Sequence, residues 1–255
     1  MRAASLRAGL LALGLAGCAA RAGVAPPPPW DERGGRDQTR LLLAGALVDA
    51  GSPEGALQVL GALRAEGMDG VEIDLVQARA LRAAGLLDDA AVLLQRVVDA
   101  EPRNGEAWRE LGVLRMDAGA VGEAVRAFEA ATRSDPRSAA AWNNLGFARL
   151  SAGDAPGAVE ALRAALERDP SDRRTRNNLG FALVAAGQTA EALRAFTAAG
   201  DAASAQYNLG VALELRGDPV AARAAYSESL RLRPADRRAA EALARLSAPS
   251  EVSPP

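Results

Sequence analysis

Asparagines that recur with the same neighbours are the side chains best suited to specific binding in this sequence. Asn144, Asn178 and Asn208 each stand directly before a Leu-Gly pair. An asparagine amide carries both a hydrogen-bond donor and an acceptor, so a ladder of amides can bond the backbone of an extended segment whatever its sequence. The pattern therefore indicates a surface for polypeptide. The alternative is that these asparagines only stabilise neighbouring turns.

The composition argues against catalysis. The chain has no histidine, Cys18 is its only cysteine, and all 30 basic residues are arginine. Histidine-based acid–base catalysis, Ser-His-Asp hydrolysis, Schiff-base chemistry and thiolate metal sites therefore lack their side chains. Glu101, Glu106 and Glu110 fall at helix positions predicted to be solvated, with no paired arrangement. We expect no enzyme activity, no cofactor, no metal and no small-molecule substrate.

Charge and glycine placement exclude two further classes. The net charge of -2 offers no basic field for nucleic acid, and only 4% of the residues are aromatic, so stacking on bases is not expected either. The glycines recur as helix punctuation and never as a phosphate-binding loop. We expect no nucleic-acid partner.

Residues 139–172 define a segment that recurs along the chain with a period of about 34 residues. Two stripes at helical spacing predict two amphipathic helices in each copy, here Trp142, Leu145, Gly146 and Arg149 at i, i+3, i+4 and i+7, then Ala158, Leu162 and Ala165. Gly146 and Ala158 are small because the two helices must cross closely. Gly153 is expected to end the first helix and Asp154 to cap the second, as are Ser52 and Asp218 in other copies.

This period and pattern resemble the tetratricopeptide repeat. The resemblance implies an all-α, right-handed solenoid of six helical hairpins with a concave and a convex face, stacked because a lone hairpin cannot bury both of its faces. The hairpins are expected at residues 37–70, 71–104, 105–138, 139–172, 173–202 and 203–236. A capping helix over 237–247 is expected to use Ala240, Leu243, Ala244 and Leu246 as its apolar stripe.

The fifth copy, residues 173–202, is shorter than the others by about one helical turn of 3.6 residues. Its second helix should therefore end near Gly200, and the solenoid should bend or change pitch there.

In tetratricopeptide repeats the first helix of each copy lines the concave groove. By this resemblance, the predicted protein-binding groove consists of Asn143, Asn144, Phe147, Asn177, Asn178, Phe181, Tyr207, Asn208 and Val211. The amides would bond a backbone, and the apolar track of Phe147, Phe181 and Val211 would select side chains. The aromatic residues expected at packing positions are Trp108, Trp142, Phe128 and Phe196.

The earlier copies place charge at the same groove positions, namely Arg79, Arg82, Arg109, Glu110 and Asp117. Such residues usually form a solvated face and only sometimes a second site. Repeats that grip chaperone C-termini carry several basic residues at defined groove positions. Arg174 is the one candidate in the best-formed half, so chaperone binding is disfavoured.

The first 36 residues differ in character from the repeats. Arg2 and Arg7 precede a short apolar run, residues 8–16, which predicts a secretory signal over residues 1–17. Leu15-Ala16-Gly17-Cys18 resembles a bacterial lipobox, which implies lipidation of Cys18. An ordinary signal cleaved at Ala20-Arg21-Ala22 and an uncleaved anchor are the alternatives.

Residues 18–36 are predicted to be a spacer, because four consecutive prolines, Pro26 to Pro29, favour a stiff polyproline II segment. The tail, residues 248–255, is predicted to be disordered.

If Cys18 is lipidated, Ala19 directly after it favours sorting of the chain to the outer membrane, facing the periplasm.

Lipobox and repeats together resemble bacterial tetratricopeptide-repeat lipoproteins, especially those assisting tight-adherence (Flp) pilus assembly and type IV pilus pilotins. The resemblance implies a monomeric, membrane-anchored scaffold that binds a protein segment of the cell envelope and assists assembly of a pilus or secretion complex. One alternative is an adaptor that recruits peptidoglycan hydrolases. Another is an accessory of a glycan or lipid enzyme, which would need a ligand pocket.

Overall fold

The computed structural model describes residues 32–247, which form thirteen α-helices and no strand. Their bounds are α2 (Glu32–Asp49), α3 (Pro53–Ala65), α4 (Val71–Ala83), α5 (Leu87–Ala100), α6 (Gly105–Asp117), α7 (Val121–Ser134), α8 (Ala139–Ser151), α9 (Ala155–Arg168), α10 (Arg173–Ala185), α11 (Thr189–Ala199), α12 (Ala202–Leu215), α13 (Pro219–Leu232) and α14 (Arg237–Ser247). The all-α prediction is confirmed.

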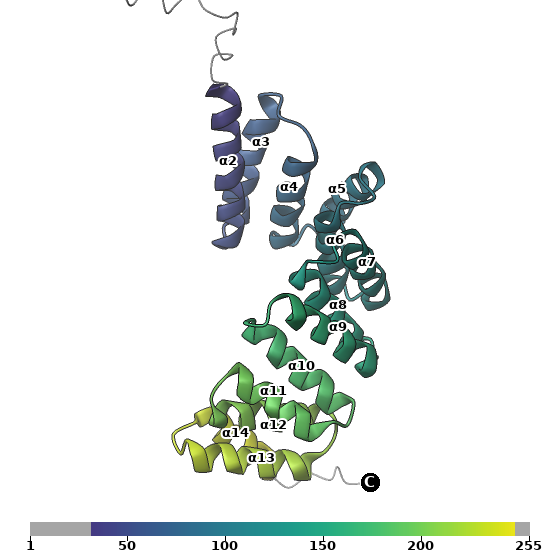
Figure 1. The fold of residues 1–255 in the computed structure, drawn as a ribbon. Coiled ribbons are helices and arrows are strands. Elements are labelled where there is room, and N and C mark those ends of the chain that lie inside the picture. The colour runs from purple at the N-terminus through teal and green to yellow at the C-terminus, as the bar shows by residue number, and fades with distance from the viewer. Residues whose placement is uncertain (1–31, 248–255) are drawn as a thin grey trace, which may run out of the picture.

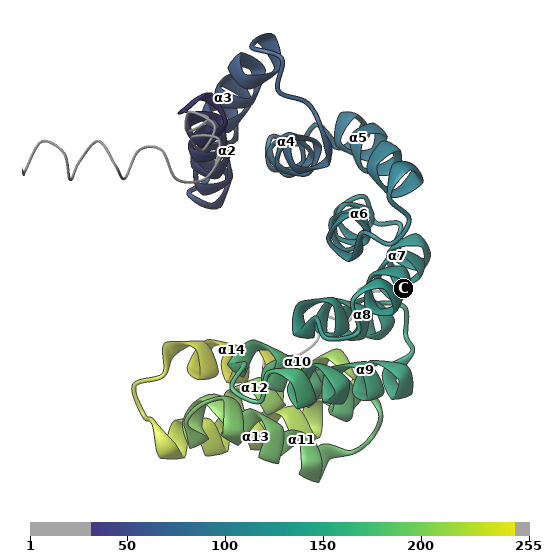
Figure 2. The same ribbon diagram turned by 45° about the horizontal axis from the view of Figure 1, so that its top comes forward.

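Consecutive helices pair into six hairpins, from α2 with α3 to α12 with α13, and α14 packs on α13 as a single closing helix. The hairpins stack in chain order into a curved solenoid (Figure 1). In Figure 2, α4, α6 and α8 line the inner edge of the curve and α5 and α7 its outer edge. The first helix of each hairpin therefore faces the concave side.

Two glycines of the fourth hairpin show how the sequence produces this geometry. Gly153 ends α8 with a φ of 83°, in the left-handed region that glycine adopts without steric cost. Gly146 lies where α8 crosses α9, and a Cβ there would come 2.5 Å from Cγ of Leu162. Both predictions, the helix stop and the close crossing, are confirmed.

The predicted helix caps form at two of the three positions. Asp154 and Asp218 accept backbone N–H bonds, that of Asp154 from Gly157 at 2.9 Å. Ser52 occupies the cap position of α3 but makes no side-chain cap bond, so that prediction is wrong. The ψ of Ser52 is 67°, similar to that of the two capping aspartates. At this ψ the longer carboxylate of aspartate reaches the backbone amide, whereas the serine hydroxyl does not. Ser138, which does cap α8, has a ψ of 102°.

The shortened fifth repeat has the predicted short second helix. α11 ends at Ala199 and has 11 residues, whereas α9 and α13 have 14 each. α12 packs directly on α10 as well as on α11, as α4 packs on α2 and α10 on α8. The first helices of the last two hairpins are therefore in close contact on the concave side.

The boundaries at the N-terminal end differ from expectation. α2 begins at Glu32, so residues 32–36, predicted to belong to the spacer, are already helical. The proline run ends at Pro29, and nothing after it stops a helix except glycines, which lower helix stability without preventing it.

The capping helix forms, but with a shifted stripe. α14 buries Ala239 and Ala242, while Ala240 and Ala244 are exposed, contrary to the predicted stripe. The predicted Leu243 and Leu246 do pack against the core cluster of the last hairpins. The helix is thus rotated from the orientation that the pattern predicted.

The predicted signal, the lipidated Cys18, most of the spacer and the tail lie outside the described residues. Within residues 32–247, no helix is both long and apolar enough to cross a bilayer.

Candidate protein-binding groove

The predicted groove asparagines lie on the concave helices α8, α10 and α12, and several of them join neighbouring repeats. Asn143 is buried, with 8% of its surface exposed. Its Oδ1 accepts a hydrogen bond from Nδ2 of Asn178 at 2.9 Å and another from Oγ1 of Thr175 at 3.1 Å. Asn143 therefore links the fourth repeat to the fifth.

The same kind of bond recurs one repeat later. Asn208 on α12 donates its Nδ2 to Oδ1 of Asn177 on α10 at 3.2 Å. Such bonds hold successive first helices in register, because each joins side chains at fixed repeat positions. The asparagines thus have a structural role beyond the neighbouring turns, and sequence reasoning missed it.

Asn143 is buried and both of its amide atoms are used, so the prediction that it contacts a ligand in the groove is wrong, whereas the other bridging amides each keep an unused atom. Within residues 32–247, Oδ1 of Asn178 and Oδ1 of Asn208 accept no hydrogen bond, and Nδ2 of Asn177 donates none. Asn144 is half-buried, and its Oδ1 lies 3.5 Å from Nδ2 of Asn143, while its own Nδ2 is unused in this part of the chain. The groove retains two acceptors and two donors for a bound backbone.

The apolar track is uneven. Phe181 is half-buried and meets Phe196 edge to face, with ring centroids 5.3 Å apart. Phe147 is 48% exposed and meets no other aromatic ring within residues 32–247, because Leu162 stands where the fifth repeat has Phe196. Phe147 is therefore the part of the track that presents the most apolar surface to a ligand.

At the C-terminal end of the apolar track, Val211 lines a hollow of about 550 Å³ between α12, α13 and α14. The ring of Tyr207 lies 5.7 Å from that of Tyr226, and the guanidinium of Arg238 lies 4.6 Å from the Tyr207 ring centroid. The capping helix therefore covers part of Tyr207. The residues that line the hollow are Tyr207, Val211, Glu214, Leu215, Tyr226 and Arg245.

The polar groups of this hollow are already paired. Burial, and then the hydrogen bond to Glu214, raise the pKa of Tyr226 above its ordinary value, so its phenol stays protonated and donates to Glu214 at 2.9 Å. Arg245 bonds both oxygens of Glu214 at 3.0 Å. What remains open is apolar, chiefly Leu215, which is 78% exposed.

The N-terminal half of the concave face, on α4 and α6, carries charges that pair with one another. Arg79 pairs with Asp49 at 2.6 Å, and Arg82 pairs with Asp117 at 2.8 Å, each across one repeat boundary. Glu110 is 4% exposed and pairs with Arg109 at 2.6 Å, so the expectation that this carboxylate is solvated is wrong. The pairs made by Arg79 and Arg82 thus link successive repeats, whereas that of Arg109 with Glu110 lies within α6.

The aromatic residues predicted in the core divide into two kinds. Phe128 and Phe196 are buried, as expected. Trp108 and Trp142 are only half-buried, because each indole lies along the surface and donates Nε1 to a proline carbonyl, at 2.9 and 3.1 Å. Both tryptophans nevertheless pack against core clusters, so their packing positions are confirmed, although neither is fully buried.

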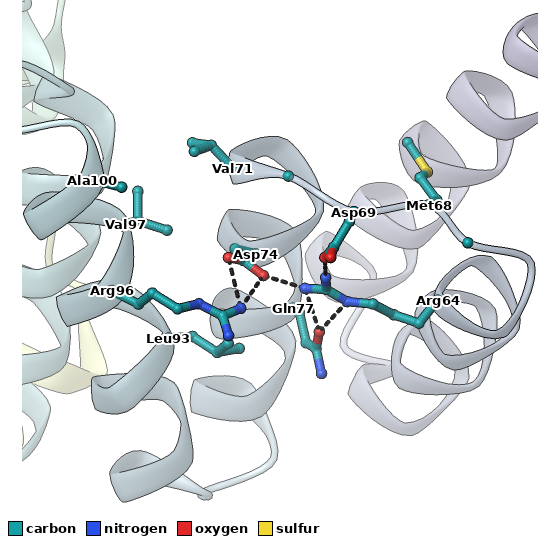
Figure 3. A pocket seen from close by; sticks show the side chains of 12 residues that line it. Arg64, Met68, Asp69, Val71, Asp74, Gln77, Leu93, Arg96, Val97 and Ala100 are labelled. Atoms are coloured by element: carbon teal, nitrogen blue, oxygen red, sulfur yellow. Dashed lines mark hydrogen bonds and ion pairs between the residues drawn. The ribbon is translucent and has the colours of Figure 1, made fainter.

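A pocket of about 650 Å³ lies between the first and second hairpins, where the sequence suggested no site (Figure 3). Asp74 at its centre is 6% exposed and accepts from Arg64 and from Arg96, the latter at 2.8 Å. The bond to Asp74 raises the pKa of Arg96. Asp74 stands at the repeat position where the next repeats have tryptophan, and Met68 at the position where they have proline. The sequence signal for this pocket was therefore the loss of two residues typical of the repeat.

The charged groups of this pocket are mutually paired. Besides Asp74, the Arg64 guanidinium bonds Asp69 and Gln77, as Figure 3 shows. In the part of the chain that the structure describes, no group of three histidine, cysteine or carboxylate side chains could hold a metal ion.

Tetratricopeptide-repeat family models match residues 75–125, 114–173 and 177–237, and a second model of the same description matches residues 149–204. These matches cover more than half of the chain, which belongs to the tetratricopeptide-repeat family. No protein of curated function matches the chain significantly in sequence.

Solved structures show the same fold at low sequence identity. The crystal structure of YrrB, described as a TPR protein with an unusual peptide-binding site, is 21% identical, with a TM-score of 0.57 over 72% of this chain and 96% of YrrB. A crystal structure of MamA is 24% identical, with a TM-score of 0.52 over 60% of this chain and 92% of MamA. A MamA fragment from Desulfovibrio magneticus RS-1 is 23% identical, with a TM-score of 0.54 over 64% and 92%.

Proposed function

We propose that this chain is a non-catalytic scaffold whose concave face binds an extended protein segment along α8, α10 and α12. The observation that carries the proposal is Phe147, a large apolar side chain that is 48% exposed beside amide atoms with no partner in the described part of the chain. A backbone bonded to the amides would bring its side chains onto the apolar track. The peptide-binding site named in the description of YrrB supports the same use of the fold.

The finer proposal places this scaffold in the bacterial envelope, anchored through lipid on Cys18 and facing the periplasm from the outer membrane. It would there assist assembly of a pilus or secretion complex. The support is the sequence Leu15-Ala16-Gly17-Cys18 after an apolar run. Stable attachment of a protein to a membrane requires two or more anchoring signals, such as acyl chains.

A crosslinking pull-down from native envelopes tests the groove. The variant Phe147→Ala/Asn178→Ala should lose the partner captured by the wild-type chain, while circular dichroism shows unchanged helical content. The matched control is Val92→Ala/Val220→Ala, which removes two side chains that are each 69% exposed but lie on second helices. The single variant Phe147→Ala separates loss of contact from loss of the Asn178–Asn143 bond.

The captured proteins decide between the finer functions. A pilus or secretion component lost from the groove variant and kept in the control supports the assembly function. Recovery of peptidoglycan hydrolases instead would favour the adaptor function. Equal recovery from the groove variant and the wild type would show that binding does not use the concave face.

The anchor is tested separately. Cys18→Ala should abolish incorporation of radiolabelled palmitate and release the chain from membranes into the soluble fraction. Retained labelling would contradict lipidation at Cys18, and retained membrane association without labelling would favour an uncleaved anchor.

A further inference from the structure

The two half-buried tryptophans occupy the same repeat position but differ in what covers them. Trp142 is covered by Arg168, whose guanidinium carbon lies 4.9 Å from the ring centroid. The residue at the matching position in the third repeat is Ser134. Within residues 32–247, no arginine stacks on Trp108. A serine is too short to cover an indole, so the face of Trp108 stays open.

Two adjoining hollows lie beside this open indole, at the junction of α5, α6 and α7. Their volumes are about 350 and 560 Å³, and both are lined by Trp108, Ala130 and Arg133. Ser134 lines the second hollow, which is where an arginine would lie if the third repeat resembled the fourth. The small Ala130 leaves space between the arginines on either side of it along α7.

The hollows carry unpaired positive charge. Arg103, Arg126 and Arg133 make no ion pair and no side-chain hydrogen bond within the described residues. The carboxylate of Glu123, which also lines the first hollow, is already paired with Arg115 at 3.1 Å. Three guanidinium groups thus surround the indole without a carboxylate of their own.

The fourth repeat has the opposite charge at the same places. The counterparts of Arg126 and Arg133 are Glu160 and Glu167, and the tryptophan there is already covered. Packing of the hairpin therefore does not require the arginines, because its neighbour folds with glutamates at those positions.

We infer that this basic hollow binds an acidic protein segment that places an apolar or aromatic side chain on the face of Trp108. Carboxylates suit the guanidinium groups, which bond them in a bidentate way, and the open indole offers apolar contact of the kind that anchors interfaces. The site lies on the side of the second helices, apart from the groove of α8, α10 and α12. It would let the scaffold hold a second partner while the groove is occupied.

Fluorescence anisotropy of the full chain with two labelled peptides tests this site. The probe has a Leu-Phe pair flanked on each side by two glutamates, and its control has glutamines in place of the glutamates. We expect the acidic probe to bind and the glutamine peptide to bind at least about tenfold more weakly.

Two variants should weaken binding of the acidic probe to the chain by about tenfold or more. Ser134→Arg covers Trp108 as Arg168 covers Trp142, and Arg126→Glu/Arg133→Glu copies the charges of the fourth repeat. The matched control, Arg194→Glu/Arg223→Glu, changes two exposed second-helix arginines that have no ion pair in residues 32–247, and it should change the dissociation constant by less than about twofold. The groove variant Phe147→Ala/Asn178→Ala should bind the probe normally.

Three results would overturn the inference. The glutamine peptide could bind as tightly as the acidic one, or the control variant could lose as much binding as Arg126→Glu/Arg133→Glu. In the third, neither peptide binds, while phosphatidylglycerol vesicles bind the lipid-free chain through these arginines. The third result would assign the basic hollow to an anionic membrane surface instead.

Discussion

The two halves of the concave face solve the same problem with different chemistry. In the half built from α4 and α6, full charges bridge successive repeats, as in the pair of Arg82 with Asp117. In the half built from α8, α10 and α12, amides do so, as in Asn178 with Asn143. Paired charges neutralise each other, whereas Asn178 bridges with its Nδ2 and keeps its Oδ1 unused within residues 32–247. The amide half therefore joins successive repeats and still has the polar atoms on which the proposed binding depends.

The largest effect should come from breaking the core beneath the amide half. Leu145 is 2% exposed, and Leu145→Asp removes a leucine whose loss alone costs about 2–5 kcal/mol and buries a carboxylate in addition. We expect cooperative loss of helical content by circular dichroism. Hydrogen exchange should rise in α8 to α10 and stay low in α3, because repeats contact only their neighbours.

A uniform rise of exchange over the whole chain would show that the two halves unfold as one unit. An unchanged melting curve would contradict the placement of Leu145 in the core.

A matched pair of truncations sharpens the comparison at one repeat position. Glu110 on α6 and Asn144 on α8 are equivalent. Glu110→Ala leaves the guanidinium of Arg109 without its carboxylate and should lower the free energy of unfolding by about 1–3 kcal/mol. Asn144→Ala breaks only a contact of 3.5 Å and should cost less than about 0.5 kcal/mol.

Urea unfolding of both variants and the wild type measures this difference. Equal costs would mean that the charged half does not depend on its ion pairs more than the other half depends on its amides.

Salt should separate the halves without mutation. The pairs of Arg79 with Asp49 and of Arg82 with Asp117 are partly exposed, so 1 M salt, with a screening length of about 3 Å, should weaken each by less than about 1 kcal/mol. Hydrogen exchange at low and high salt should show faster opening of α4 and α6 and little change in α8 and α10. A larger change in the amide half would contradict the assignment of its bridges.

The smallest effect that we expect is a loss of stability at acid pH through Asp201, the residue that caps α12 in the last hairpin. The backbone N–H of Ser204 and then the Arg233 guanidinium hold the pKa of Asp201 below its ordinary value. Because the pKa is lower in the folded chain than in the unfolded one, the stabilisation is complete above about pH 4 and declines as the pH falls below that value. Urea midpoints at pH 5 and pH 3 should fall less for Asp201→Asn than for the wild type.

The fold was predictable because its determinants lie within one repeat. Gly153 stops a helix and Gly146 permits a close crossing through contacts inside the same hairpin, and α11 is short because residues are missing from its copy. Errors occurred at the ends, where no neighbouring copy constrains the register, as at the start of α2 and on the buried stripe of α14.

The candidate site was predictable only in part. The repeat pattern places Phe147 and the asparagines on the first helices of their hairpins, and they lie there, on α8, α10 and α12. The repeat pattern could not show that Asn143 is buried and bonded to Asn178. Nor could it show that Phe181 packs against Phe196, whereas Phe147 has no such ring contact in the described residues. Those outcomes depend on how far one hairpin is rotated and shifted against the next.

The sequence alone thus specified the hairpins, their number and the helices that face inward, because local periodicity and turn chemistry act over a single repeat. Tertiary structure alone decided which amide atoms remain unused and which tryptophan stays open. Asn208 finds Asn177, and Trp108 lacks a cover that Trp142 has, only once the stacked hairpins bring side chains about one repeat apart into contact.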